Sequence, residues 1–190
     1  MANQDVRTLT EARALAAMAN PYRSRILDAL KVDGPSTSSA LARRTGQAVG
    51  SVSHHVRVLA EAGLVEEAAE LAKDRRERWW RLTSRSTRWS RAEFPDDPQA
   101  VSAALAAENL ALARQFARAQ EWQDNFEAEG DWGDAAFATQ TWLRLSPDEL
   151  RELSRQMLDL IASWSAREIP DDEQAREPIF LFARAFPAQP

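Results

Sequence analysis

The sequence of 190 residues contains no cysteine, which excludes a disulfide framework and any metal or redox site built on thiolates. It has only two histidines, so few imidazole ligands are available for a metal ion. No apolar run approaches the ~18–20 residues that are needed to cross a bilayer. Residues 1–7 lack a basic region followed by an apolar core, so no signal peptide is predicted. We therefore expect a soluble, cytoplasmic protein without a membrane partner or a cofactor.

The net charge of −5 hides a strong asymmetry between the two halves of the chain. Residues 1–92 hold 16 Lys and Arg against 10 Asp and Glu, whereas residues 93–190 hold 8 against 19. The first half is therefore basic and the second acidic. This separation predicts that the first half meets a polyanion and that the second half has another role.

The segment 46–64 has the most informative pattern in the chain. On a helix at 100° per residue, Val52, Val56 and Leu59 fall within a narrow arc and define the buried side. The opposite arc has no acidic residue before Glu61 and consists of Gln47, Gly50, Ser51, His54 and Arg57. A solvated helix face normally mixes Glu with Lys. An acid-free face of small donors and acceptors suits a helix in a DNA major groove, and the alternative is an ordinary amphipathic helix rich in Ser and His.

Three further helices are predicted before this segment, over about 8–19, 21–33 and 36–45. Thr8 and Glu11 offer a capping box for the first. A proline in its first turn opens the second, which ends at a Gly-Pro pair, and a glycine ends the third. The predicted buried stripe of the second helix is Tyr22, Ile26, Leu27 and Leu30.

After Leu64 the apolar period changes from helical to two, which predicts a hairpin. Residues 73–76 form its polar tip and residues 77–82 its returning strand. Helices followed by a hairpin with an arginine-rich tip are the layout of a winged helix-turn-helix, in which the last helix enters the major groove and the tip reaches the DNA backbone. The predicted phosphate contacts of the hairpin are Arg75, Arg76 and Arg78. A solvated hairpin is the alternative.

Three motifs occur in order: A-N-P-Y-R-S-R-I-L-D-A-L, S-V-S-H-H-V-R-V-L-A-E-A-G-L-V and R-R-E-R-W-W-R-L-T. Together they resemble the winged-helix regulators of the ArsR/SmtB type over about residues 8–85. The resemblance implies a homodimeric, sequence-specific repressor of transcription. Metal-sensing members carry cysteines in the third helix, where Thr37 and Ser39 stand here, and no histidine follows the hairpin. Metal sensing of the familiar kinds is therefore not expected.

The predicted contacts to double-stranded DNA divide into two groups. Gln47, Ser51 and His54 are expected to face base edges. Ser53, His55 and Arg57 are expected to serve the approach to phosphates or the helix's own packing.

The predicted fold class is mainly α with a small amount of β. A DNA-binding domain over 1–85 and a linker over 86–97 precede a C-terminal dimerisation domain over 98–190. A long helix over about 98–129 has apolar residues near heptad spacing and could pair with a second helix. Asn109 could set the register between protomers or lie in water at the edge of the seam. The predicted dimerisation residues are Leu15, Leu105, Asn109, Leu112 and Phe116.

The end of the chain is predicted to form strand, helix and strand. Residues 137–145 and 179–186 have strand patterns, and a capping box at Ser146 opens the helix between them. They could form a small helix-covered sheet within one protomer or across a dimer. The helix is expected to bury Leu150, Leu153, Met157, Leu160, Ile161 and Trp164.

All seven Phe and four of the seven Trp lie beyond residue 93. They could line a pocket for a small-molecule effector, or form a hydrophobic core or dimer interface. Two functions follow from the sequence. The leading one is a homodimeric transcriptional regulator, and the alternative is a winged-helix protein-interaction module with an acidic aromatic surface. No arrangement typical of an enzyme is found, since catalytic groupings, phosphate-binding glycine loops and metal-ligand spacings are lacking.

Overall fold

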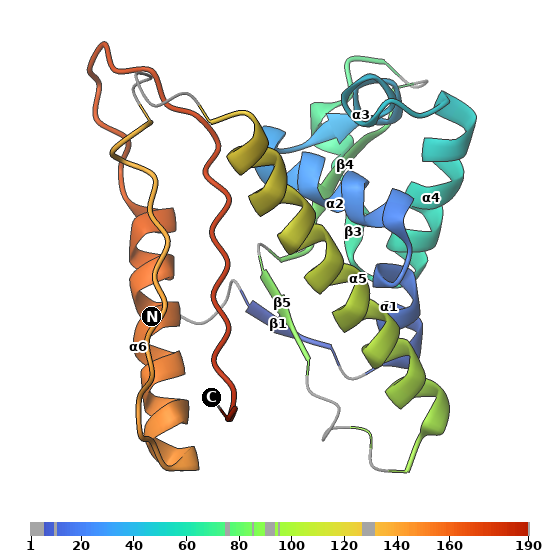
Figure 1. Cartoon of the computed structure of the whole chain (residues 1–190). Coiled ribbons are helices and arrows are strands. Elements are labelled where there is room, and N and C mark those ends of the chain that lie inside the picture. Colours follow the sequence, from blue (N-terminus) through green and yellow to red (C-terminus); the bar gives the residue numbers. More distant parts are fainter. Residues whose placement is uncertain are drawn as a thin grey trace. The chain divides into compact units, whose positions relative to one another are not determined.

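The computed structural model describes residues 6–9, 11–74, 77–84, 86–89, 94, 96–126 and 132–189. The chain forms two compact units, Asn3–Ala117 and Arg118–Pro190 (Figure 1). None of the helices in the described ranges is long and apolar enough to span a membrane.

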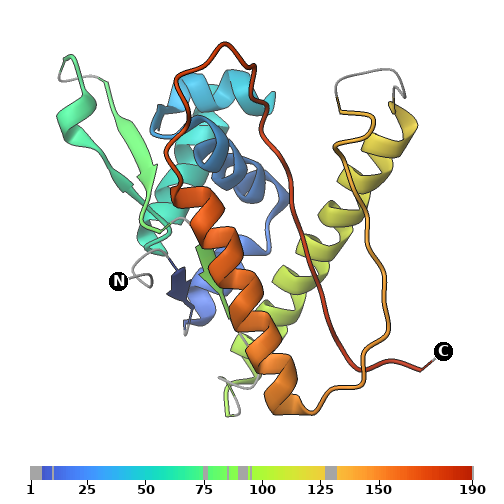
Figure 2. The same ribbon diagram turned by 90° about the vertical axis from the view of Figure 1, so that its left-hand side faces the viewer.

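In its described residues, the N-terminal unit contains five helices and two small sheets. Its elements are β1 (Val6–Thr8), α1 (Ala12–Met18), α2 (Pro21–Asp33), β2 (Ser36–Thr37), α3 (Ser38–Thr45), α4 (Val49–Glu61), β3 (Val65–Glu67), the 3-10 turn η1 (Ala69–Leu71), β4 (Trp79–Leu82), β5 (Ser86–Arg88) and the first part of α5 (Pro98–Asp124). Strands β2, β4 and β3 form an antiparallel sheet in that order, with Val65 opposite Leu82. Strands β1 and β5 pair in parallel. The β3–β4 hairpin projects from the helices (Figure 2).

Local sequence sets the helix ends. Asn20 caps α2, since its side-chain oxygen accepts hydrogen bonds from the backbone N–H groups of Tyr22 and Arg23 at 3.0 and 3.1 Å. The α3–α4 turn begins at Gly46, whose φ of 67° is left-handed. At the end of α4, Gly63 has φ 66°, and the backbone N–H of Leu64 donates to the carbonyl of Leu59 at 2.9 Å. This Schellman-type ending turns the chain from α4 into the hairpin.

The core lies between the helices and the three-stranded sheet. Val52, Val56 and Leu59 of α4 have no exposed surface, as their helical spacing predicts. Each stabilises the fold by about 1.5–3 kcal/mol relative to an exposed side chain. The other fully buried large residues are Leu9, Leu15, Ile26, Leu41 and Val65.

The first part of α5 belongs to this core. Ala100 and Ala104 are completely buried in it, and Arg114 of α5 donates to Asp28 of α2. The division between the units consequently falls inside α5. The predicted linker over 86–97 contains β5 and the buried Phe94.

Three local predictions in the N-terminal unit are wrong. The first helix starts at Ala12, and Glu11 precedes it without a side-chain cap bond. The capping box does not form because Thr8 lies in β1, paired with Arg88. Tyr22, placed in the buried stripe of α2, is 50% exposed because it stacks on a neighbouring histidine instead.

The C-terminal unit contains the end of α5, which stops at Asp124 rather than near 129, and α6 (Pro147–Ala166). Residues 127–131 lie outside the described ranges. The capping box of α6 is confirmed, because Ser146 and Glu149 exchange both hydrogen bonds. The two predicted strands do not form within one chain, because residues 137–145 and 179–186 carry no strand pairing (Figure 1). The predicted burial along α6 is also wrong, since none of its residues is buried.

Candidate nucleic-acid interface

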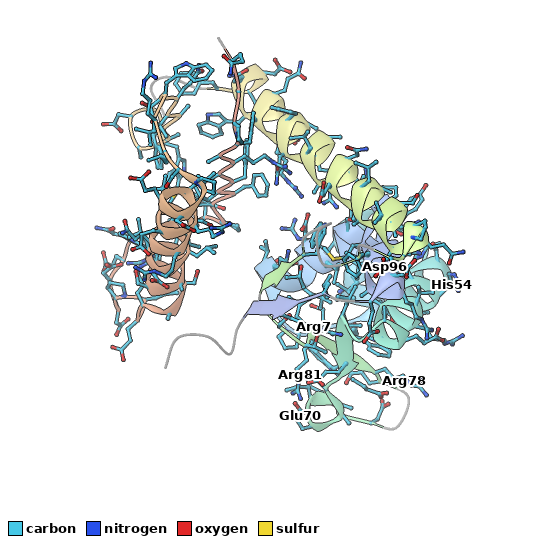
Figure 3. All side chains as sticks on the ribbon, turned by 90° about the horizontal axis from the view of Figure 1, so that it is seen from below. Arg7, His54, Glu70, Arg78, Arg81 and Asp96 are labelled. Atoms are coloured by element: carbon cyan, nitrogen blue, oxygen red, sulfur yellow. The ribbon has the colours of Figure 1, made fainter. Side chains whose placement is uncertain are left out.

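Helices α3 and α4 meet at a tight turn that fixes the outer face of α4. Leu41 of α3 and Val52 of α4 are both buried in the core cluster. With the inner face anchored in this way, the outward residues of α4 include Gly50, Ser51, His54 and Arg57, all of them exposed. His54 is labelled in Figure 3. Ser53 and His55 are half-buried beside this face.

The exposed face of α4 lets another surface approach closely. A Cβ added at Gly50 would meet nothing within 4 Å, so the space in front of the backbone is open. The only acidic residue of α4, Glu61, receives a hydrogen bond from Arg13 of α1 at 2.6 Å. Arg13 was not anticipated, because the two residues are 48 positions apart and no local pattern links them.

The β3–β4 hairpin stands next to α4 and mixes both signs of charge. Arg81 donates to Glu66 at 2.8 Å and also to Glu70, while Arg78 lies 3.9 Å from Glu67 (Figure 3). Arg78 is exposed and its distance to Glu67 is at the limit of an ion pair, so its guanidinium is available to an outside anion. Arg81 is already occupied by two carboxylates.

A family model described as a helix-turn-helix domain matches residues 18–68. The N-terminal unit is a winged helix-turn-helix. The helix-turn-helix is α3 and α4, with α4 as the recognition helix, and the wing is the β3–β4 hairpin. This confirms the winged helix-turn-helix fold predicted from the sequence.

Two solved structures from Mycobacterium bovis are similar to the chain. One is the crystal structure of a possible transcriptional regulatory protein (fragment 1–100), 24% identical with a TM-score of 0.35, over 56% of this chain and 89% of that chain. The other is the solution structure of a homodimeric winged helix-turn-helix DNA-binding domain of a possible ArsR-family regulator. It is 22% identical with a TM-score of 0.35, over 61% of this chain and 85% of that chain. No curated protein matches the chain.

His55 of the recognition helix lies inward against α2. Its ring stacks on Tyr22 with centroids 5.7 Å apart and planes 9° apart. Burial lowers the pKa of His55, and the charges of Arg23 and His54 lower it further. A neutral imidazole on an aromatic ring is a packing element, which fits the packing role among those predicted for His55.

Gln47, in the turn before the recognition helix, differs from the other predicted base-facing residues. Both polar atoms of its amide are inaccessible to solvent and have no hydrogen-bond partner. Leaving a buried amide unsatisfied costs about 1–3 kcal/mol. In this conformation the amide does not face outward as Ser51 and His54 do.

Of the predicted wing arginines, Arg75 and Arg76 lie outside the described residues. Near the tip of the wing, the backbone N–H of Lys73 donates to the carboxylate of Glu77 at 3.0 Å. This bond is the main reason that the pKa of Glu77 is lowered.

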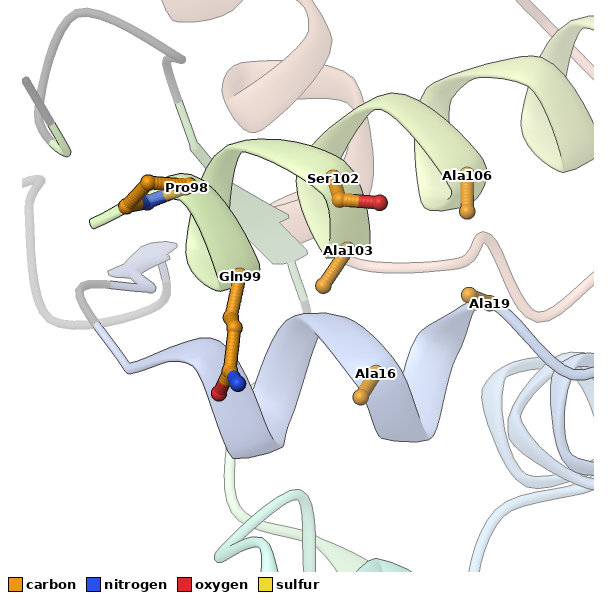
Figure 4. A pocket seen from close by; sticks show the side chains of 7 residues that line it. All are labelled: Ala16, Ala19, Pro98, Gln99, Ser102, Ala103 and Ala106. Atoms are coloured by element: carbon orange, nitrogen blue, oxygen red, sulfur yellow. The ribbon is translucent and has the colours of Figure 1, made fainter.

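An open groove runs between α1 and α5 (Figure 4). Its lining is small: Ala16, Ala19, Pro98, Gln99, Ser102, Ala103 and Ala106. A second shallow hollow lies at α3, between Asp33 and the arginines Arg43 and Arg44. The aromatic residues beyond residue 93, considered for an effector pocket, line neither of them.

The five predicted dimerisation residues fall into two environments. Leu105, Asn109 and Phe116 are exposed along α5, with Leu112 half-buried between them. Leu15 is completely buried in the core, so its side chain is not available to a partner. Within the described ranges, no group of three or more His, Cys, Asp or Glu side chains is close enough to hold a metal ion.

Proposed function

We propose that this protein is a sequence-specific DNA-binding regulator of transcription that acts as a homodimer and represses its target genes. The observation that carries the proposal is the exposed face of the recognition helix, which has no acidic residue before Glu61 and is held on a buried stripe of Val52, Val56 and Leu59. A helix of this kind in a winged helix-turn-helix lies in the major groove of DNA.

In this proposal, some of the exposed residues of α4 contact the bases and others contact the DNA backbone. Ser51 and His54 read base edges, because they are exposed donors and acceptors at the start and middle of the helix. Arg57 and Ser53 bind phosphates. On the inner side of the helix, the ring of His55 stacks on Tyr22 and packs the helix against α2. Gln47 reaches a base edge only after its amide turns outward.

The wing adds contacts to the DNA backbone beside the groove. Arg75, Arg76 and Arg78 bind phosphates in this proposal, and for Arg78 the support is its exposure and its loose pairing with Glu67. Such contacts do not distinguish sequences.

The homodimer forms in part along α5. Leu105, Asn109, Leu112 and Phe116 follow one another at intervals of four, three and four residues, so they share one side of the helix. A small-residue groove between α1 and α5 adjoins this helix and permits close approach of a partner. Two recognition helices about 34 Å apart then read a pseudo-palindromic site. The proposal includes no metal effector, and a small-molecule effector would act through the C-terminal unit.

The test is to select bound fragments from a genomic library and to measure fluorescence anisotropy of the selected duplex at several salt concentrations. A protein that neutralises several phosphates loses affinity steeply with salt, by roughly 10³-fold between 50 and 200 mM for about six contacts. Arg78→Ala should weaken selected and random duplexes alike and reduce this slope. Absence of binding at micromolar protein would instead favour a winged helix used for protein contacts.

A further inference from the structure

We propose that residues 137–145 of one chain pair with residues 179–186 of a second copy, and the reverse, so that both segments become β-strands in a dimer. The paired strands and the two copies of α6 then form the core that the C-terminal unit lacks alone. This inference rests on the homodimer proposed above and assigns it a second interface, separate from α5.

The two segments have the sequence of strands without the pairing of strands. Segment 137–145 is rich in the β-branched and aromatic residues that favour strands, with Phe137, Thr139, Thr141 and Trp142, and Ser146-Pro147 ends it. Pro178 and Pro187 bound the other segment. Prolines at these places are compatible with a strand, because a ladder tolerates them at its ends. Nevertheless no strand is formed anywhere between residues 132 and 189. A segment with a strand sequence that is not paired within its own chain can pair with a strand of another chain.

The side chains of both segments are exposed although they are large and apolar. Phe137, Trp142, Ile179 and Phe186 are 79%, 61%, 70% and 71% exposed. Isolated apolar residues on a surface are ordinary, but a concentration of this size marks an interaction site.

Helix α6 has one solvated face and one uncovered face. On the solvated face, Arg155 donates to Glu152 at 2.9 Å and to Asp159 at 2.8 Å. The other face carries Leu160 and Trp164, which are 59% and 60% exposed. An amphipathic helix gains stability by burying its apolar stripe, and a sheet is a suitable cover. The charged side chains of α6 already have partners within the helix, so the apolar face is the one that would pack against the paired strands.

A second copy of this chain supplies what is missing. In a two-fold dimer every contact occurs twice, so segment 137–145 of one chain can pair with 179–186 of its partner and the reverse. The exposed apolar surface of the unit is also large enough for a stable dimer interface. A fully buried aromatic residue hides about 150–250 Å², so the exposed parts of Phe137, Trp142, Trp164 and Phe186 offer roughly 500 Å² per chain. The aliphatic residues bring the total close to the roughly 800 Å² per partner of a standard interface.

Amide hydrogen exchange on the full chain at increasing protein concentration tests this pairing, with sedimentation velocity run in parallel and no DNA present. The expected result is that the amides of 137–145 and 179–186 become protected over the concentrations at which the chain dimerises. Three results would overturn it: a chain that stays monomeric, a dimer whose two segments exchange freely, or protection that is the same in the monomer.

Proline variants give a second readout. Thr141→Pro and Leu181→Pro remove ladder donors, so each should raise the dimer dissociation constant at least tenfold. Ala175→Pro is the matched control, since it lies in the same unit outside both segments and should leave dimerisation unchanged. Equal effects of all three would contradict the pairing. The melting temperature of the winged domain reports whether the variants fold.

DNA binding is measured separately, so the two proposals fail independently. If the chain dimerises and binds DNA while both segments exchange freely, only the strand-pairing proposal is contradicted. Protected segments in a protein that binds no DNA remove only the regulator.

Discussion

Arg13 of α1 donates a hydrogen bond to the carboxylate of Glu61 at the end of the recognition helix, at 2.6 Å. Both side chains are more than half exposed, so the pair adds little to folding stability. Because Glu61 lies on the helix proposed to meet DNA, the pair also changes the charge of that helix. The only carboxylate on the helix proposed to meet DNA is neutralised by a cation from a different helix.

Arg13→Ala should therefore weaken binding to every duplex, by about twofold to threefold at low salt, because the uncovered carboxylate repels phosphates. Folding stability should change by no more than about 1 kcal/mol. Anisotropy titrations measure the first effect and thermal unfolding the second. The control is Arg13→Ala combined with Glu61→Gln, which should restore the affinity. Without that rescue, Arg13 touches DNA itself and the neutralising role is wrong.

Gly50→Ala separates folding from DNA binding. The added Cβ meets no protein atom within 4 Å and the residue is helical, so stability should rise, by up to about 1 kcal/mol. If this face lies against DNA, the methyl group occupies space that the duplex needs, and affinity should fall by about tenfold, or 1.4 kcal/mol. Gln123→Ala near the end of α5, exposed and outside the groove between α1 and α5, is the control. Unchanged DNA affinity in Gly50→Ala would show that the helix face stays clear of the duplex.

Gly63→Ala should destabilise the protein by about 1–2 kcal/mol, because a residue with Cβ is strained at φ 66°. The new Cβ would also lie 3.0 Å from Nη1 of Arg7, which donates to the carbonyl of Gly63. Gly46→Ala has nearly the same φ, 67°, with nothing within 4 Å, so it should cost less. Chemical denaturation of the two variants measures the difference. Equal losses would mean that the contact with Arg7 has no effect on stability.

The lowered pKa of His55 predicts a pH dependence of stability. The folded state binds a proton less readily than the unfolded state, so stability is fully present above the ordinary pKa of 6.5 and decreases as the pH falls below it. His55→Phe keeps a ring against Tyr22 and should flatten the melting temperature between pH 7.5 and 5.5. Ser51→Ala, a change without a titrating group on the exposed side of the same helix, is the control. A wild-type protein whose melting temperature is independent of pH in this window contradicts the assignment.

Local patterns in the sequence were sufficient to predict the recognition helix of the winged domain, its buried side and its end. The helical period placed Val52, Val56 and Leu59 in the core, and Gly63 marked the end of the recognition helix. These predictions hold because burial and backbone conformation are decided within a few residues. Thr8 failed for the opposite reason, since its partner in β5 is distant in sequence and outweighs a local capping box.

The predictions that failed in the C-terminal unit depended on partners that periodicity does not identify. The strand patterns at 137–145 and 179–186 indicate an extended backbone, but a strand also needs a neighbouring strand, and a single chain does not provide one. The same holds for Trp164 on α6, whose spacing marks an apolar face but not what covers it. In the candidate site, the sequence identified the exposed Ser51 and His54 but could not show that Gln47 turns its amide inward.

The most direct measurement is a hydrogen-exchange and chemical-shift footprint of the full chain on its selected duplex at moderate salt. The account predicts the largest changes at Gly50, Ser51, His54 and Arg57, with weaker ones at the wing. Binding that leaves this face of α4 unchanged and perturbs the C-terminal unit instead would contradict the assignment of the recognition helix.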